Sequence, residues 1–149
     1  MLFRSTHTLP LTEGWVFQHI DDRADNDYFG MTQPNFDDSA WEKRPFGIWS
    51  LPDHRAVKHG MFRKHFTVPA HWKGGEVGLW LQSWFNTTFV DQGRVYLDGK
   101  MIRDFRPDGI MGELVKGVFT PSSAHTLAVE IKSAQPMAGA RGNAWLQRL

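Results

Sequence analysis

Alternating hydrophobic and polar residues between Gly60 and Gly99 predict three successive β-strands. The first run is Met61–Pro69, the second is Glu76–Trp84 and the third is Arg94–Lys100, and turn residues separate the first two. Successive side chains of a strand point to opposite faces, so a period of two is typical of a strand with one face in the core. The predicted core face carries Phe62, Phe66, Val68, Val77, Leu79 and Leu81; the opposite face of the first strand carries Arg63, His65 and Thr67, and Lys64 interrupts its apolar face.

The rest of the chain adds strands and turns. Further strands are predicted at 15–20, 114–120, 126–132 and 143–149, and Asp98-Gly99 between two apolar pieces predicts a hairpin. Helical spacing of hydrophobic residues is never sustained beyond two turns, and one helical turn is predicted at Phe36–Trp41, capped by Asp37 or Asp38. About eight antiparallel strands predict an all-β fold: a β-sandwich jelly roll, formed by residues 1–149 as a single domain.

The composition narrows the classes of function. Lysine and arginine (17 residues) nearly balance aspartate and glutamate (16), so the net charge of +1 gives no reason to expect a nucleic-acid partner. No apolar run approaches the roughly 20 residues that span a membrane, and the N-terminus shows no signal peptide. The lack of cysteine excludes disulfides and thiolate zinc sites. Seven tryptophans are more than one core normally requires, which suggests that some of them stack against a ligand.

Four motifs, taken in order along the chain, carry a family resemblance. They are Gly14–Phe17 (GWVF), Phe36–Trp41 (FDDSAW), Gly60–Pro69 (GMFRKHFTVP) followed by Trp72-Lys73-Gly74, and Val95–Lys100 (VYLDGK) with Thr126–Ile131 (TLAVEI) downstream. Together they resemble the N-terminal sugar-binding domain of family 2 glycoside hydrolases, the β-galactosidase and β-glucuronidase group. That domain is a galactose-binding-domain-like jelly roll. Asp98 stands where the family usually has asparagine.

The resemblance implies an accessory domain. In family 2 enzymes the catalytic acid and nucleophile are two glutamates of a separate barrel domain, and the jelly roll binds sugar or supports a loop of the active site. The expected partner is therefore a catalytic glycosidase domain in the same protein. An extracellular or periplasmic location is expected for a polysaccharide-degrading system.

The residues themselves show no catalytic constellation. A glycosidase needs two carboxylates that face each other across the scissile bond. No serine lies in a Gly-x-Ser-x-Gly elbow. We therefore expect no catalytic residue and no enzyme activity from this chain, with a small independent glycosidase or lyase as the remaining alternative. The glutamates are interpreted as solvated charges beside turns or on outward strand faces: Glu13, Glu42, Glu76, Glu113 and Glu130.

Metal binding has little support in the sequence. The loop residues Asp21, Asp22, Asp25, Asn26 and Asp27 offer oxygen ligands for a structural calcium ion. This loop lacks EF-hand spacing, so a solvated turn is the preferred interpretation. The seven histidines form no H-x-x-x-H pair on a predicted helix. No cofactor and no metal ligand are predicted.

Sugar recognition requires a flat aromatic face against the pyranose ring, and charged or amide side chains that bind its hydroxyl groups. Loops at the rim of a rigid sandwich are expected to supply both. Trp15, Trp41, Trp80 and Trp145 are assigned to the core or to packing between the sheets, and Trp72 to a cap over the sandwich edge. The residues predicted to bind sugar, all placed on loops, are Trp49, His54, Arg55, Trp84, Asn86, Arg106, Asp108, Arg141 and Asn143.

Two hypotheses for the function follow. The first is a non-catalytic carbohydrate-binding module, associated with a polysaccharide-degrading glycoside hydrolase, that holds an oligo- or polysaccharide at the loops at one end of the sandwich. The alternative is a structural accessory domain that supports the catalytic domain of a family 2-like glycosidase and binds no sugar itself. Neither involves a nucleic acid or a membrane.

Overall fold

The computed structural model describes residues 7–20, 28–46, 48–49, 59–84, 92–105, 110–132, 138–139 and 141–149. For residues 28, 48–49, 82–84, 92, 105, 110–112, 138–139 and 141–143 it describes the backbone alone. The sequence predictions that fall on other residues, among them the calcium loop 21–27, lie outside the described residues.

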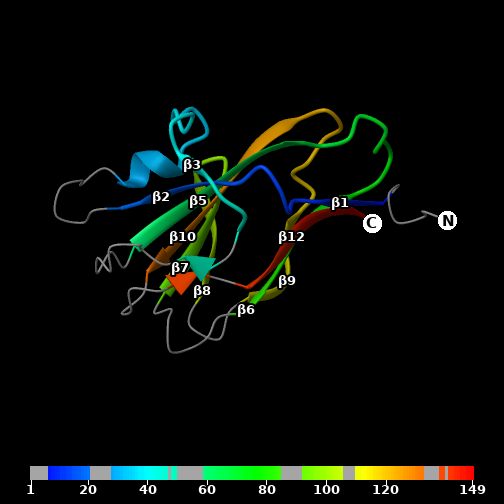
Figure 1. The fold of residues 1–149 in the computed structure, drawn as a ribbon. Helices are drawn as coiled ribbons and strands as arrows, with labels where there is room; N and C mark the ends of the chain where they lie inside the picture. Colours follow the sequence, from blue (N-terminus) through cyan, green and yellow to red (C-terminus); the bar gives the residue numbers. More distant parts are fainter. Residues whose placement is uncertain are drawn as a thin grey trace.

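The described residues form two antiparallel sheets that pack face to face, so the predicted all-β sandwich is confirmed, and the arrangement is consistent with a jelly roll (Figure 1). Twelve strands are described, of which eight have four or more residues. The four-stranded sheet has the order β1 (Thr8–Pro10), β12 (Arg141–Arg148), β6 (Val77–Trp84), β9 (Ile110–Lys116). The six-stranded sheet has the order β3 (Glu42–Lys43), β2 (Val16–His19), β5 (His59–Thr67), β10 (Ala124–Lys132), β7 (Gln92–Leu97), β8 (Lys100–Phe105). A two-residue ladder joins β4 (Ile48–Trp49) to β11 (Ala138–Gly139).

The main core lies between the two sheets and follows the predicted alternation. In β5 and β6 all six residues predicted to face the core are buried, and in β10 the residues Leu127, Val129 and Ile131 are completely buried. Trp15 and Trp72 belong to the same core, together with Phe17 and Leu11. The Trp15 indole N–H donates to the carbonyl of Leu11 at 2.7 Å, so this large side chain is buried without leaving its polar atom unsatisfied.

A second hydrophobic cluster covers the other face of the six-stranded sheet. The 3₁₀ helix η2 (Tyr28–Thr32) and the chain that follows it lie over this face, and Met31, Phe36 and Trp41 pack against side chains of the sheet. The cluster also contains Val16, Met61, Tyr96 and Ala128 of the sheet, and Ile20 directly after β2. Strands β5 and β10 are therefore buried on both faces, although their sequences alternate as half-buried strands do.

The hairpin predicted at Asp98-Gly99 joins β7 to β8. Both turn residues have positive φ angles, 52° for Asp98 and 86° for Gly99, as a type I′ turn requires. Asp98 also ties the hairpin to β10, because its backbone N–H donates to the carbonyl of Thr126 at 2.9 Å and its Oδ1 accepts the Thr126 N–H at 2.8 Å. The carboxylate therefore fixes the turn and its neighbouring strand at the same point.

Three sequence predictions are wrong about local structure or burial. Residues 36–41 form turns, and the helical turn lies earlier, at η2. Trp41 is nevertheless buried as expected. Glu130 is not a solvated charge, because only 2% of this residue is exposed. Trp80 and Trp145 do not pack between the sheets, since each alternates with buried core residues and is partly exposed on the outer face of the four-stranded sheet.

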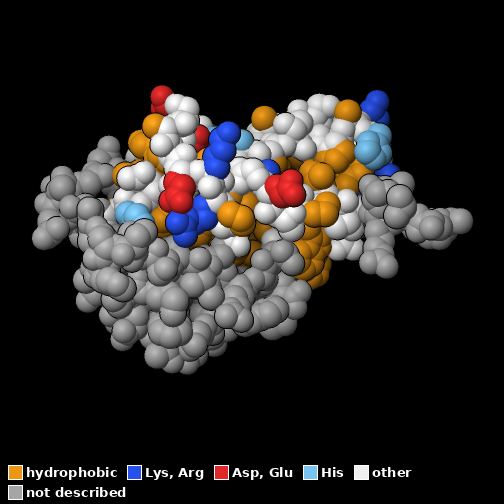
Figure 2. All heavy atoms as spheres, viewed as in Figure 1, with side chains coloured by type: hydrophobic (Ala, Val, Ile, Leu, Met, Phe, Trp, Pro, Cys, Tyr) orange, Lys and Arg blue, Asp and Glu red, His pale blue; other side chains and the backbone are white. Residues whose placement is uncertain are grey.

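Charges of both signs are intermixed on the face of the molecule that Figure 2 shows. This distribution agrees with the balanced composition, in which acidic and basic residues are almost equal in number. Within the described part of the chain, no helix has the length and apolar character needed to cross a membrane.

Candidate functional site

The residues predicted to bind sugar fall into two groups in the structure. His54, Arg55, Asn86, Arg106 and Asp108 lie outside the described residues. The backbones of the other four belong to strands, so the loop placement is wrong for Trp49 and Arg141, whereas Trp84 and Asn143 lie in strands predicted at 76–84 and 143–149. Trp49 is in β4, Trp84 ends β6, and Arg141 and Asn143 begin β12.

Backbone pairing brings these four positions into one region of the fold. Trp84 and Arg141 lie directly opposite each other in the β6–β12 ladder, and Asn143 is opposite Gln82. Trp49 pairs with Ala138, three residues before Arg141. Trp49 and Trp84 therefore pair with residues 138 and 141, which are close together in the chain. This region of the fold lies away from β1 and the C-terminus (Figure 1).

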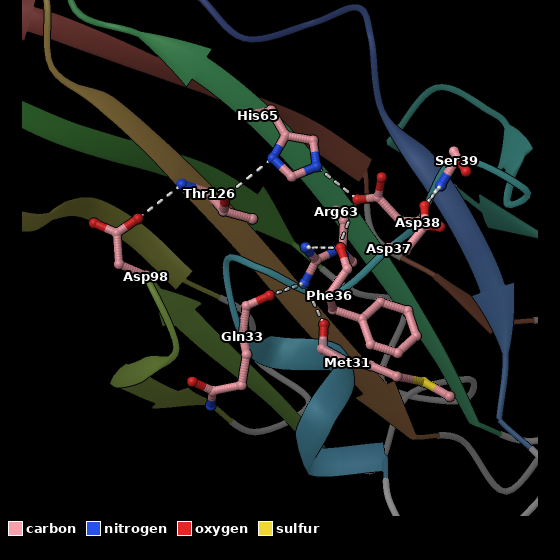
Figure 3. A network of polar contacts seen from close by, with 10 residues as sticks. All are labelled: Met31, Gln33, Phe36, Asp37, Asp38, Ser39, Arg63, His65, Asp98 and Thr126. Carbon is pink, nitrogen blue, oxygen red and sulfur yellow. Dashed lines mark hydrogen bonds and ion pairs between the residues drawn. The ribbon is translucent and has the colours of Figure 1, made fainter.

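Arg63 is the centre of the most extensive polar site among the described residues. Its side chain is fully buried beneath the segment that follows η2 (Figure 3). Nε donates to Asp38 Oδ2 at 2.8 Å, and Nη1 donates to the carbonyls of Met31 and of Gln33, the latter at 2.9 Å. Nη2 reaches the carbonyl of Phe36 at 3.5 Å. One guanidinium thus holds four groups of residues 31–38 against the sheet, which is a geometry that the planar fork of arginine favours.

A chain of hydrogen bonds runs from this arginine across the sheet (Figure 3). His65 donates its Nε2–H to Asp38 Oδ2 at 2.7 Å, and its Nδ1 lies 2.9 Å from Thr126 Oγ1. Thr126 in turn donates its backbone N–H to Asp98. His65, Asp98 and Thr126 line a hollow of about 490 Å³ together with Thr67 and His125. The hollow therefore presents imidazole, carboxylate and hydroxyl groups that lie in fixed positions.

One end of the chain has the distances of a Ser-His-Asp triad. His125 Nδ1 is 2.6 Å from Asp98 Oδ2, and His125 Nε2 is 2.8 Å from Ser123 Oγ. The Ser123 hydroxyl also donates to the carbonyl of Thr120 at 2.6 Å and accepts the Thr120 N–H at 3.3 Å. We therefore interpret Ser123 as the cap of the turn 120–123, which the imidazole fixes to the hairpin. This contact also gives a physical reason for aspartate at position 98, because its two carboxylate oxygens meet the imidazole of His125 and the backbone N–H of Thr126.

The pKa of Asp38 is set by opposing effects. Burial acts to raise it, but the hydrogen bonds from Arg63 and His65 and the attraction of their charges lower it, and the pKa of Asp38 lies below its ordinary value of 3.8. A carboxylate with a lowered pKa stabilises the folded state above its unfolded pKa, and this contribution is lost as the pH falls through the folded pKa.

The Asp38→Asn variant should therefore show a pH-dependent loss of stability. At about pH 7 we expect its free energy of unfolding to be about 1–3 kcal/mol below that of the unmodified chain, because the charged hydrogen bonds of Asp38 are lost. At about pH 2 the two curves should lie closer together, because this contribution is lost as the pH falls through the folded pKa of Asp38. Urea unfolding at the two pH values measures this, and Asp104→Asn, at an exposed position of β8, is the control. An equal loss at both pH values would contradict the expectation.

A second buried charged group lies in the six-stranded sheet. Glu130 Oε2 is 2.6 Å from Nε2 of His59, with both side chains only 2% exposed, and Glu130 Oε1 is 3.5 Å from Nη1 of Arg94. The sequence prediction missed this group because strand alternation puts Glu130 on the outward face. It also missed the role of Arg63, although the opposite charges of Asp38 in the segment Phe36–Trp41 and Arg63 in the segment Gly60–Pro69 were a signal for it.

Lys64, the exception on the apolar face of β5, is partly buried. Its Nζ lies beside Gly14, where a Cβ atom would be 2.9 Å from it. Burial lowers the pKa of Lys64, and the nearby negative charge of Glu13 opposes this effect. Among the described residues, no group of three His, Cys, Asp or Glu side chains is placed to hold a metal ion.

Comparison with known proteins gives a match in structure alone. No family model and no curated protein sequence matches this chain. Among solved structures, Bacteroides uniformis beta-glucuronidase 2 aligns with 95% of this chain at a TM-score of 0.66 and 18% identity. Ruminococcus gnavus beta-glucuronidase aligns with 95% at a TM-score of 0.64 and 16% identity. A glycosyl hydrolase family 2 member from Bacteroides cellulosilyticus aligns with 95% at a TM-score of 0.63 and 15% identity.

These matches define the class of the fold. The alignments cover 18% of the first of these chains, 28% of the second and 20% of the third, so this chain spans less than a third of their length. It therefore has the fold of one β-sandwich part of these family 2-type glycosidases. At such low sequence identity, the similarity concerns the fold.

Proposed function

We propose that this chain is a non-catalytic, carbohydrate-binding domain of a family 2-like glycoside hydrolase, with residues 1–149 as one domain. The observation that carries the proposal is the structural match: nearly the whole chain corresponds to 18–29% of several beta-glucuronidases. In this proposal the catalytic residues belong to another domain of the same protein, and the β-sandwich holds part of the carbohydrate.

The backbone pairings support a sugar site at the end of the sandwich that carries β4 and β11. They gather Trp49, Trp84, Arg141 and Asn143, whose indole, guanidinium and amide groups are the chemistry that sugar rings and hydroxyls require. The matched enzymes are beta-glucuronidases, so oligosaccharides that carry uronic acids belong among the ligands tested.

One observation favours a second candidate, a structural accessory domain that binds no sugar. The most extensive polar site, around Arg63, uses its hydrogen bonds to hold residues 31–38 against the sheet. Such an arrangement serves rigidity, and a rigid sandwich is what a supporting domain needs.

Isothermal titration calorimetry of the chain with neutral and uronic acid-containing oligosaccharides distinguishes the carbohydrate-binding domain from the structural accessory domain. We expect modest affinity, with dissociation constants of about 1 mM or somewhat lower, or roughly 4–5 kcal/mol, because a shallow site removes little surface from water. Trp84→Ala should abolish this binding, whereas Phe29→Ala, at an exposed aromatic residue of η2 over the six-stranded sheet, should not change it. Absence of binding to the whole panel would favour the structural candidate.

A further inference from the structure

Two tryptophans lie side by side on the outer face of the four-stranded sheet. Trp80 of β6 is directly opposite Trp145 of β12, with the ring planes within 9° of parallel and the ring centroids 6.1 Å apart. Trp80 lies between the core residues Leu79 and Leu81, and the neighbours of Trp145 in the chain are core residues as well. Because side chains alternate along a strand, both indoles point away from the core. Both are partly exposed, and hydrophobic side chains reach the surface in the region of β12 and β9 in Figure 2.

The neighbouring residues explain why both indoles lean toward the same end of the ladder. Gly78 precedes Trp80 by two residues, and a Cβ atom there would lie 3.2 Å from Trp80 Nε1, so the absence of a side chain lets the indole lie over this position. On β12 the Trp145 indole N–H donates to Gln147 Oε1 at 3.3 Å, and Gln147 is opposite Gly78. The Trp80 indole N–H, by contrast, has no hydrogen-bond partner among the described residues.

Polar side chains frame the tryptophan pair. Glu113 of β9 is the cross-strand neighbour of Trp80, and Lys116 is the neighbour of Gly78. With Gln147 on the other strand, a carboxylate, an ammonium and an amide belong to residues at the register positions of Trp80 and of Gly78, two residues away. A protein interface usually has a broader apolar centre from which charged residues are depleted. Two aromatic rings bordered so closely by hydrogen-bonding groups fit a pyranose ring, whose apolar face is surrounded by hydroxyls.

From this geometry we infer that the Trp80–Trp145 face is a second glycan-binding surface, for a chain of hexopyranose units that stack on the indoles and bind Glu113, Lys116 and Gln147 through hydroxyl groups. The inference rests on the proposed carbohydrate-binding function and extends it from the end of the sandwich to the face of a sheet. Trp84 and Arg141 pair four residues further along the same two strands. An oligosaccharide that follows β6 and β12 therefore connects the two sites.

The test uses cellohexaose, mannohexaose and a uronic acid-containing hexasaccharide as probes. We expect Trp80→Ala and Trp145→Ala each to weaken binding of at least one probe by about tenfold or more. Trp80→Phe should weaken it less, and the control Phe29→Ala should leave it unchanged. Thermal unfolding of each variant checks the fold. In the unmodified chain, the indole N–H resonances of Trp80 and Trp145, assigned with the phenylalanine variants, should shift on addition of the probe, which gives a result even if an alanine variant unfolds.

The outcomes separate this inference from the proposed function. Binding that is unchanged in both alanine variants but lost in Trp84→Ala would overturn the sheet-face site and leave the proposed function standing. Absence of binding to every probe would overturn both. Self-association of the chain that Trp80→Ala abolishes, without any resonance shift on addition of sugar, would assign the face to a protein contact and likewise overturn the inference.

Discussion

Replacement of Arg63 by alanine is expected to lower the free energy of unfolding by about 3–5 kcal/mol, a large fraction of the stability of a domain of this size. The guanidinium is fully buried, and its removal takes one donor from Asp38, which keeps His65, and one from the carbonyl of Gln33, and leaves the carbonyl of Met31 without the Arg63 donor. A buried polar group that loses its partner pays the full cost of desolvation. The guanidinium carbon also lies 5.6 Å and 5.9 Å from the ring centroids of Phe36 and Trp41, so cation–π contacts are lost as well.

Urea unfolding measures this loss, and Arg44→Ala is the matched control. Arg44 is partly exposed and pairs with Glu42, whose side chain is 56% exposed, so its removal should cost less than about 1 kcal/mol. Arg63→Lys keeps the charge but cannot reproduce the fork of donors, and it should recover only part of the loss. If Arg63→Ala were no more harmful than Arg44→Ala, residues 31–38 would have to be held by their hydrophobic contacts.

The sequence was sufficient to predict the inner faces of the two sheets. Leu127, Val129 and Ile131 of β10 alternate strictly with other residues, which places these three large apolar side chains on one face of the sheet. The Asp98-Gly99 hairpin was equally predictable, because few residue pairs adopt two successive positive φ angles. These features depend on residues close together in the chain.

The outer faces were not predictable in the same way. Alternation places Arg63 and Glu130 opposite the core, but it does not say that residues 28–41 return to cover that face. The same rule fails to place Trp80 and Trp145, because a large aromatic residue is favoured both in a core and on the outer face of a strand. Of the predicted sugar-binding residues, the structure relates Trp49, Trp84, Arg141 and Asn143 through their backbones. That relation arises from strand pairing across more than 50 residues, which no local pattern encodes.

The second large effect is expected at Glu130, the buried carboxylate of β10. Glu130→Ala should lower the free energy of unfolding by about 2–4 kcal/mol, because His59 then loses the acceptor at 2.6 Å in a place where both side chains are almost inaccessible to water. The carboxylate also faces Arg94 at 3.5 Å, so its removal takes a negative charge away from this cation. Glu130→Gln keeps the shape and one acceptor oxygen, and should cost about half as much.

The control for Glu130 is Glu76→Ala, at an exposed glutamate just before β6, for which the expected change is within about 0.5 kcal/mol. Chemical denaturation at neutral pH measures all three variants. A loss at Glu130 no greater than at Glu76 would mean that water reaches the carboxylate in solution. A large loss in Glu130→Ala with near-normal stability in Glu130→Gln would instead show that the hydrogen bond to His59 matters more than the negative charge.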